Sequence, residues 1–209
     1  MKLVILDRDG TINADRDDYV KSPEEWVPLP GAMEAIARLN HAGWHTVIAT
    51  NQSGLHRGLF DMSTLNAMHA KLNRELALAG GRIDAVFFCP HTPTERCDCR
   101  KPLPGLFTKI GERFGVNLAD VIAVGDSLRD LQAAAAVGCQ THLVRTGKSD
   151  PARLDDAGAE QLAARVPGTV VHADLGVFAE FVVQRERRAR AVARGEAETR
   201  SESAPGELR

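Results

Sequence analysis

Two acidic side chains able to do chemistry follow the first apolar segment of the chain. Residues 2–6 read Lys-Leu-Val-Ile-Leu, which is typical of a short strand, and Asp7 and Asp9 come directly after it, before Gly10. Because side chains alternate between the two faces of a strand, residues two apart point the same way. Clustered carboxylates are ligands that suit magnesium. The spacing favours a magnesium site, although an ordinary Asp-Gly turn after a strand has the same sequence.

Polar side chains of complementary chemistry follow at three later points. Thr50 comes at the end of an apolar segment typical of a strand, and Lys101 lies in a polar stretch before a helical segment. Asp126 ends another apolar segment, and Asp130 lies four positions further on. Carboxylates hold a metal, whereas a hydroxyl and an ammonium bind phosphate. The residue types together predict a site for a metal and a phosphate.

The order of these residues resembles the haloacid dehalogenase superfamily of phosphotransferases. Its motifs are Asp-x-Asp-x-Thr, a Ser or Thr, a Lys, and Gly-Asp-x-x-x-Asp, and all four occur in that order within residues 7–130. The resemblance implies that Asp7 is the nucleophile, forming an aspartyl-phosphate, and that Asp9 is the general acid and then the base. It implies magnesium held by the carboxylates of Asp7 and Asp126 and the backbone carbonyl of Asp9, with Asp130 supporting the metal-bound waters.

The remaining polar residues of these motifs are candidates for binding the substrate. Thr50 and Lys101 are expected to bind the transferring phosphoryl oxygens and stabilise the charge that develops there. Asn51 is expected to help position the phosphate. Arg100 and Arg57 are candidates for contacting a hydroxyl or a second phosphate, because a guanidinium matches phosphate geometry. The alternative for both arginines is a solvated position on the surface.

A second metal site is predicted by a cluster of cysteines and a histidine. Cys89, His91, Cys97 and Cys99 lie within a short polar segment that leads into the Arg-Lys-Pro sequence. Three thiolates and one imidazole match a closed tetrahedral zinc site, although soft donors also suit an iron–sulfur centre. Four protein ligands leave no position for water, so we expect a structural zinc that orders the loop. The alternative is a set of incidental cysteines, and Cys139, in an apolar run, is expected to be a buried thiol.

The zinc loop narrows the family resemblance. A loop of this kind directly before Arg-Lys-Pro, together with Asn-Gln-Ser-Gly at residues 51–54, resembles the D-glycero-D-manno-heptose 1,7-bisphosphate 7-phosphatases and the related histidinol-phosphate phosphatases. The gap between His91 and Cys97 is shorter than in many members. The resemblance implies removal of the 7-phosphate of the heptose bisphosphate in ADP-heptose and lipopolysaccharide core biosynthesis. The alternatives are a histidinol-phosphate phosphatase and a zinc-stapled binding module with a vestigial site.

The elements that must position these residues alternate along the chain. Alternating strands and helices predict a single Rossmann-like, doubly wound parallel sheet in the α/β class, with no inserted cap domain. We expect a loop from residue 145 onward, a weaker strand over residues 169–171, and a helix from residue 175 to about 184. The other expected strands are residues 2–6, 46–49, 85–88, 121–124 and 140–144, and the other expected helices are residues 31–42, 62–79, 106–114 and 128–137.

Composition sets the class of the protein and its partners. The 209 residues are 44% hydrophobic and 26% charged, which indicates a soluble globular protein, and the net charge of −2 argues against a nucleic-acid or membrane partner. We expect a cytoplasmic monomer acting on a small phosphorylated sugar, because no apolar run suggests a signal or a membrane span. Residues 1–184 are expected to form the phosphatase domain. Residues 185–209, rich in Arg, Glu, Ala and Ser, are expected to be a charged tail, a frayed helical extension followed by disorder.

Overall fold

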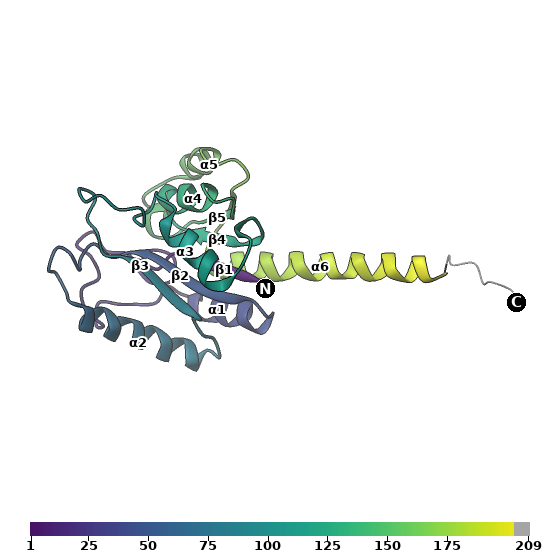
Figure 1. Ribbon diagram of the computed structural model, residues 1–209, viewed down its shortest axis with the longest axis horizontal. Coiled ribbons are helices and arrows are strands. Elements are labelled where there is room, and N and C mark those ends of the chain that lie inside the picture. Colours follow the sequence, from purple (N-terminus) through teal and green to yellow (C-terminus); the bar gives the residue numbers. More distant parts are fainter. Residues whose placement is uncertain (203–209) are drawn as a thin grey trace, which may run out of the picture.

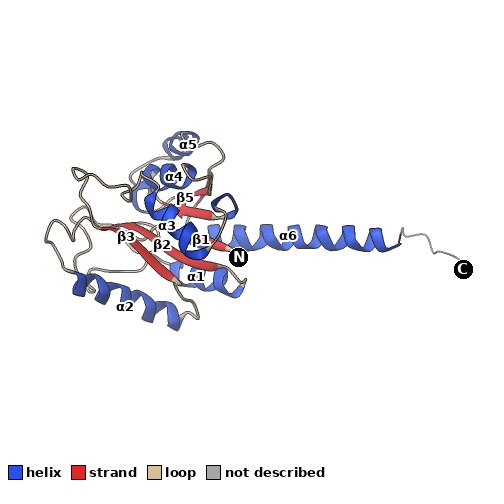
Figure 2. Cartoon of the chain, in the orientation of Figure 1, coloured by secondary structure: helices blue, strands red, loops and turns tan. Residues whose placement is uncertain are grey.

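The fold is built around one parallel β-sheet (Figure 1, Figure 2). The computed structural model describes the backbone of residues 1–202 and the side chains of residues 1–193. The strands are β1 (Leu3–Leu6), β2 (His45–Asn51), β3 (Ala85–Cys89), β4 (Ile122–Gly125), β5 (Gln140–Val144) and β6 (Val170–His172). They pair in parallel in the order β3-β2-β1-β4-β5-β6, which confirms the predicted doubly wound sheet.

The direction of the strand order reverses between β1 and β4. From β1 the chain adds β2 and β3 on one side, whereas β4, β5 and β6 follow on the other. In open α/β sheets, ligands bind in the crevice at the carboxyl ends of the strands at such a reversal. Asp7 follows β1 directly and Asp126 follows β4, and the Asp7 amide donates to Val124 O at 3.0 Å. The sheet topology therefore brings these two carboxylates together.

Helices cover both faces of the sheet. Helices α1, α2 and α6 pack on the face that carries Val4 and Leu6, and α3 and α4 pack on the face that carries Leu3 and Ile5. Figure 1 shows the two groups on opposite sides of the strands, with α5 beside α4. The helices are α1 (Ala32–His41), α2 (Met62–Leu78), α3 (Gly105–Phe114), α4 (Leu128–Ala135), α5 (Asp156–Ala164) and α6 (Leu175–Glu202), with the 3-10 turns η1 (Leu118–Asp120) and η2 (Gly147–Ser149).

Helix α5 is an element that the sequence analysis did not predict, because it expected a loop from residue 145. The helix has only nine residues, includes Gly158, and buries only small side chains, Ala159 and Ala163. Its periodic signal is therefore weak. Its start is stabilised by Asp155, whose side chain accepts a hydrogen bond from the Gly158 amide at 2.8 Å.

Helix α6 continues past residue 184 into the segment where a frayed helical extension was expected. It runs for 28 residues and extends well beyond the sheet in Figure 1. Glu186, just past that position, pairs with Lys2 at 2.8 Å and accepts from the Trp44 indole at 3.0 Å. Disorder was also expected for residues 203–209, which lie outside the described residues. No described helix combines the length and apolar composition needed to cross a bilayer.

Candidate active site

A cavity of about 200 Å³ opens at the carboxyl ends of the central strands. Asp7 and Asp9 enter it from the end of β1, Thr50 from β2, and Asp126 from the end of β4. Lys101 reaches it from the loop before α3. The structure thus brings together residues that are far apart in the sequence, as the motif order predicted.

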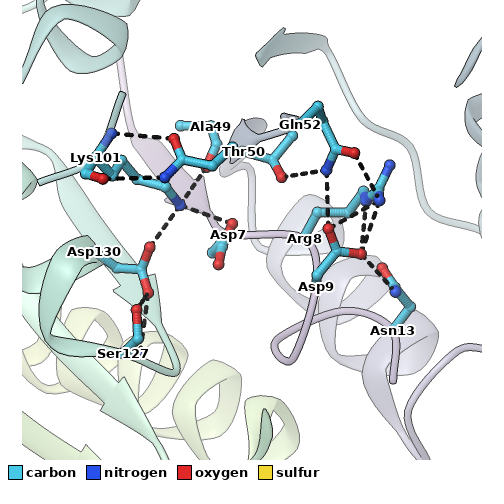
Figure 3. Close-up of polar contacts among 11 residues, drawn as sticks. Asp7, Arg8, Asp9, Asn13, Ala49, Thr50, Gln52, Lys101, Ser127 and Asp130 are labelled. Carbon is cyan, nitrogen blue, oxygen red and sulfur yellow. Dashed lines mark hydrogen bonds and ion pairs between the residues drawn. The ribbon is translucent and has the colours of Figure 1, made fainter. Parts of the chain in front are cut away.

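Lys101 is the central cation of the site (Figure 3). Its Nζ atom lies 2.7 Å from Asp7 Oδ1 and 2.5 Å from Asp130 Oδ1, and it donates to Ala49 O at 2.8 Å. Burial and the neighbouring Asp130 raise the pKa of Asp7 to about 7, although Lys101 opposes the shift. Burial alone would lower the pKa of Lys101, but Asp130 and Asp7 raise it, so the ammonium stays charged.

Three carboxylates converge beside this ammonium. Asp7, Asp126 and Asp130 each offer an oxygen, and these oxygens lie within 4.8 Å of one another. Burial, then repulsion from Asp130 and Asp7, raises the pKa of Asp126 well above its usual value. A cation placed among these groups would offset the repulsion. The donor set therefore fits a hard divalent cation.

The turn around Asp126 requires two glycines. Gly10 and Gly147 have φ angles of 86° and 54°, in the left-handed region. A Cβ on either would collide with the Asp126 carboxylate. The amide of Lys148 donates to Asp126 Oδ2 at 2.5 Å, which fixes the carboxylate from the same side. The backbone thus closes tightly around one prospective metal ligand.

Asp9 is held by several donors on the other side of Asp7 (Figure 3). Arg8 Nη2 lies 2.8 and 2.9 Å from its two oxygens, and Asn13 and Gln52 each donate to it at 2.9 Å. Burial would raise the pKa of Asp9, but the Arg8 charge and these hydrogen bonds lower it below its usual value. Sequence analysis gave no role to Arg8, Asn13 or Gln52, although Gln52 lies two positions after Thr50.

Thr50 and Asn51 line the cavity from the end of β2. The Thr50 hydroxyl oxygen accepts from Gln52 Nε2 at 2.8 Å, which leaves its proton free to donate. The side chain of Asn51 donates to Lys101 O and accepts from Lys101 N, both at 3.1 Å. Asn51 therefore clamps the backbone of Lys101.

The two predicted substrate-binding arginines lie in different places. Arg100 lines the cavity, and its guanidinium donates to His91 O at 2.9 Å. Arg57 is exposed and outside the cavity lining, with its guanidinium carbon 5.9 Å from the ring centre of Tyr19. Tyr19, Arg129 and Lys148 also line the cavity. Sequence analysis gave them no role, because only the tertiary structure shows that these polar residues face the cavity.

The predicted zinc ligands converge next to the cavity. One ligand atom from each of Cys89, His91, Cys97 and Cys99 lies within 4.8 Å of the others. The sulfurs of Cys89 and Cys97 are 3.9 Å apart, close to the ~3.8 Å expected around a tetrahedral zinc ion. The donor set and its spacing therefore fit a structural zinc. Cys139 lies apart from this group and is buried, as predicted.

Comparisons with known proteins agree with this geometry. A family model described as HAD-hydrolase-like matches residues 98–174. The chain is 55% identical to a D-glycero-beta-D-manno-heptose-1,7-bisphosphate 7-phosphatase of Bordetella bronchiseptica over 88% of this chain and 99% of that one. It is 49% identical to the Pseudomonas aeruginosa enzyme of the same name, over 87% and 98%. A crystal structure of the B. bronchiseptica phosphatase, complexed with magnesium and phosphate, superposes with a TM-score of 0.82 over the same shares.

Proposed function

This chain belongs to the D-glycero-beta-D-manno-heptose-1,7-bisphosphate 7-phosphatase family of haloacid dehalogenase-like hydrolases, and on that premise we propose that it removes the 7-phosphate of the heptose bisphosphate. The observation that carries the proposal is the position of Asp7, which lies at the reversal point of the sheet, 2.7 Å from Lys101 and beside Asp126. The reaction serves ADP-heptose formation for the lipopolysaccharide core. A cytoplasmic monomer and a phosphatase domain ending near residue 184 are part of the same proposal.

Asp7 acts as the nucleophile in the first step. One of its carboxylate oxygens forms a bond to phosphorus, and the bond from phosphorus to O7 of the sugar breaks. Lys101 and the Thr50 hydroxyl donate to the phosphoryl oxygens as charge develops on them. Asn51 contributes by holding the backbone of Lys101 in place.

Asp9 moves the protons. It gives a proton to the departing O7, and in the second step it takes one from the water that attacks the aspartyl-phosphate. The low pKa that Arg8 and the hydrogen bonds impose suits the base step. For the acid step, a bound phosphate dianion raises the pKa of Asp9 again, because a nearby like charge disfavours the ionised form.

Two metal sites support this chemistry. The carboxylates of Asp7 and Asp126, with Asp130 nearby, would hold magnesium. The family resemblance adds the backbone carbonyl of Asp9 to these ligands. Bound magnesium neutralises the negative charge that the carboxylates and the phosphate bring together. Zinc on the four Cys and His ligands would order the loop that presents Arg100 and Lys101.

Specificity depends on cations at the mouth of the cavity. Arg100 offers a guanidinium to a hydroxyl or to the second phosphate, which it can bind in a bidentate way. Arg57 is the more remote candidate, because it would have to leave Tyr19 to reach the cavity. A bisphosphate should therefore be a better substrate than a monophosphate.

Steady-state phosphate release from three substrates tests the function. We expect the heptose 1,7-bisphosphate to be cleaved at position 7 with a far higher kcat/KM than a heptose monophosphate or histidinol phosphate. Arg100→Ala should narrow this preference, because it removes binding energy used in the transition state. Equal efficiency on bisphosphate and monophosphate, or a preference for histidinol phosphate, would defeat the substrate assignment.

A further inference from the structure

Arg8 is a buried cation whose part in the mechanism above is limited to lowering the pKa of Asp9. Its side chain is 1% exposed. Side chains alternate between the faces of a strand, so the Arg8 side chain points to the same face as Val4 and Leu6. The Asp7 side chain points to the opposite face, with Leu3 and Ile5. A buried guanidinium is costly unless it is paired. Among the described residues, the carboxylate paired with Arg8 is that of Asp9.

The contact between Arg8 and Asp9 has the geometry of a clamp (Figure 3). Arg8 Nε and Nη2 both donate to Asp9 Oδ1, at 3.1 and 2.8 Å, and Nη2 also reaches Oδ2 at 2.9 Å. The side-chain amide of Asn13 donates to Asp9 Oδ1, and that of Gln52 donates to Asp9 Oδ2. Gln52 in turn accepts from Arg8 Nη2 at 3.2 Å, so the clamp is tied to the end of β2.

The clamp fixes the side chain of Asp9, whose backbone lies in a turn rather than in a strand. Asp9 lies beyond the last residue of β1 and next to Gly10, which adopts a positive φ angle. A carboxyl group that transfers a proton must be within hydrogen-bond reach of the reacting oxygen. An error of about 1 Å in such a position can cost about 100-fold in rate.

We propose that Arg8 is a positioning residue for the proton transfer, and that it acts through Asp9 on the departing sugar oxygen. This rests on the proposed phosphatase function. In the step concerned, the Asp7–phosphorus bond forms, the phosphorus–O7 bond breaks, and the Asp9 proton moves to O7. Arg8 holds the Asp9 carboxyl so that this proton reaches O7.

The leaving group separates this role from a purely structural one. A sugar alkoxide is strongly basic and needs a proton to depart, whereas p-nitrophenolate is weakly basic and departs without one. The value of kcat/KM reports only the steps up to the first irreversible one, the loss of the leaving group. Loss of the proton donor should therefore lower kcat/KM for the sugar phosphate and leave kcat/KM for p-nitrophenyl phosphate nearly unchanged.

The experiment compares variants on both substrates with magnesium and zinc bound. For Arg8→Met we expect kcat/KM on the heptose bisphosphate to fall by about 100-fold or more, with a change within about threefold on p-nitrophenyl phosphate. Asp9→Asn should show the same pattern. Adding Arg8→Met to Asp9→Asn should cause no further loss, because Arg8 acts through Asp9. Arg113→Met, an exposed arginine on α3, is the control and should match the wild type.

A second variant protects the test against misfolding. Arg8→Lys keeps the buried charge but replaces the fork with a single point of contact, and it should show the same substrate-selective loss in a milder form. Equal losses on both substrates in a folded variant, or additive losses in the double variant, would overturn the proposal. Any alkyl phosphate that the wild type cleaves can replace the heptose, so a wrong substrate assignment is detected separately, by the wild-type kinetics.

Discussion

The Nζ atom of Lys101 lies 2.7 Å from Asp7 Oδ1 and 2.5 Å from Asp130 Oδ1. One buried cation thus holds the Asp7 carboxylate in place and compensates the charge of a second carboxylate. Its backbone is clamped by Asn51, and it follows the cysteine-rich loop directly. The position of the Asp7 carboxylate is therefore linked to the order of that loop.

Lys101→Met should affect both activity and stability. Removing a preorganised donor to a developing charge costs about 10² to 10³ in kcat. Leaving buried carboxylates without their partner should also lower the free energy of unfolding by about 3 kcal/mol. Phosphate release and urea unfolding measure the two effects, with the exposed Lys109→Met as a control. A variant with wild-type kcat would show that Lys101 has no role in the transition state.

Asp7→Asn should abolish turnover while the fold remains. The amide cannot attack phosphorus, yet it fills the same space. It also removes the repulsion from Asp130, which adds to burial in raising the pKa of Asp7 to about 7. The thermal midpoint should therefore not fall. Single-turnover assays and magnesium titration test this, with Asp120→Asn as a control. Activity within about tenfold of wild type, a barrier change of only ~1.4 kcal/mol, would exclude Asp7 as the nucleophile.

Much of the site follows from residue types and chain order. Asp7 and Asp126 come at the ends of apolar segments, and parallel strands bring such ends to one edge of the sheet. Cys89, His91, Cys97 and Cys99 are close together in the sequence, so their spacing alone predicts that they cluster, as they do in the structure. Lys101 was predicted from the order of the motifs along the chain. Its ammonium contacts Asp7 in the structure, as that prediction requires.

The missed residues depend on tertiary placement. Arg8 reads as an incidental polar residue between two acids, and only the packed structure shows that its guanidinium folds back onto Asp9. Arg57 was predicted as a candidate for substrate binding. Nothing in a loop sequence fixes the direction of its side chain, which lies over Tyr19 in the structure. Helix α5 was missed because small residues give a weak periodic pattern.

The zinc prediction can be tested by metal analysis and a matched pair of cysteine variants. Freshly purified protein should carry about one zinc per chain. Cys97→Ala should lose the metal, loosen residues 89–101 and lower activity indirectly, through displacement of Arg100 and Lys101. Cys139→Ala, at a buried thiol outside the cluster, should keep the metal. Full activity in protein stripped of zinc, or no tightly held metal in the wild type, would contradict a structural zinc.

A buried histidine pair makes the stability of the fold depend on pH. His142 on β5 and His172 at the end of β6 are 1% and 5% exposed, and their ring nitrogens lie 2.8 Å apart. Burial, with His172 and Arg185 adding to it, lowers the pKa of His142 to about 3. Burial lowers that of His172 to about 4, although Asp174 opposes the shift. Both rings are therefore neutral in the folded protein at pH 5.

The unfolded chain binds more protons at that pH, because its histidines have pKa values of about 6.5. The contribution of this pair to the free energy of unfolding is thus fully present above about pH 6.5 and is lost as the pH falls toward 4. Between pH 7 and 5 the loss is about 2 kcal/mol for each histidine. Urea unfolding at pH 7 and 5 should show a smaller loss for His142→Asn than for wild type, whereas the exposed His41→Gln should keep the wild-type loss. Because the carboxylates and metal ligands are the same in all three proteins, their pH dependence cancels in the comparison. An identical loss in His142→Asn and wild type would mean that His142 is already protonated in the folded protein, or that it is shielded from water in the unfolded one.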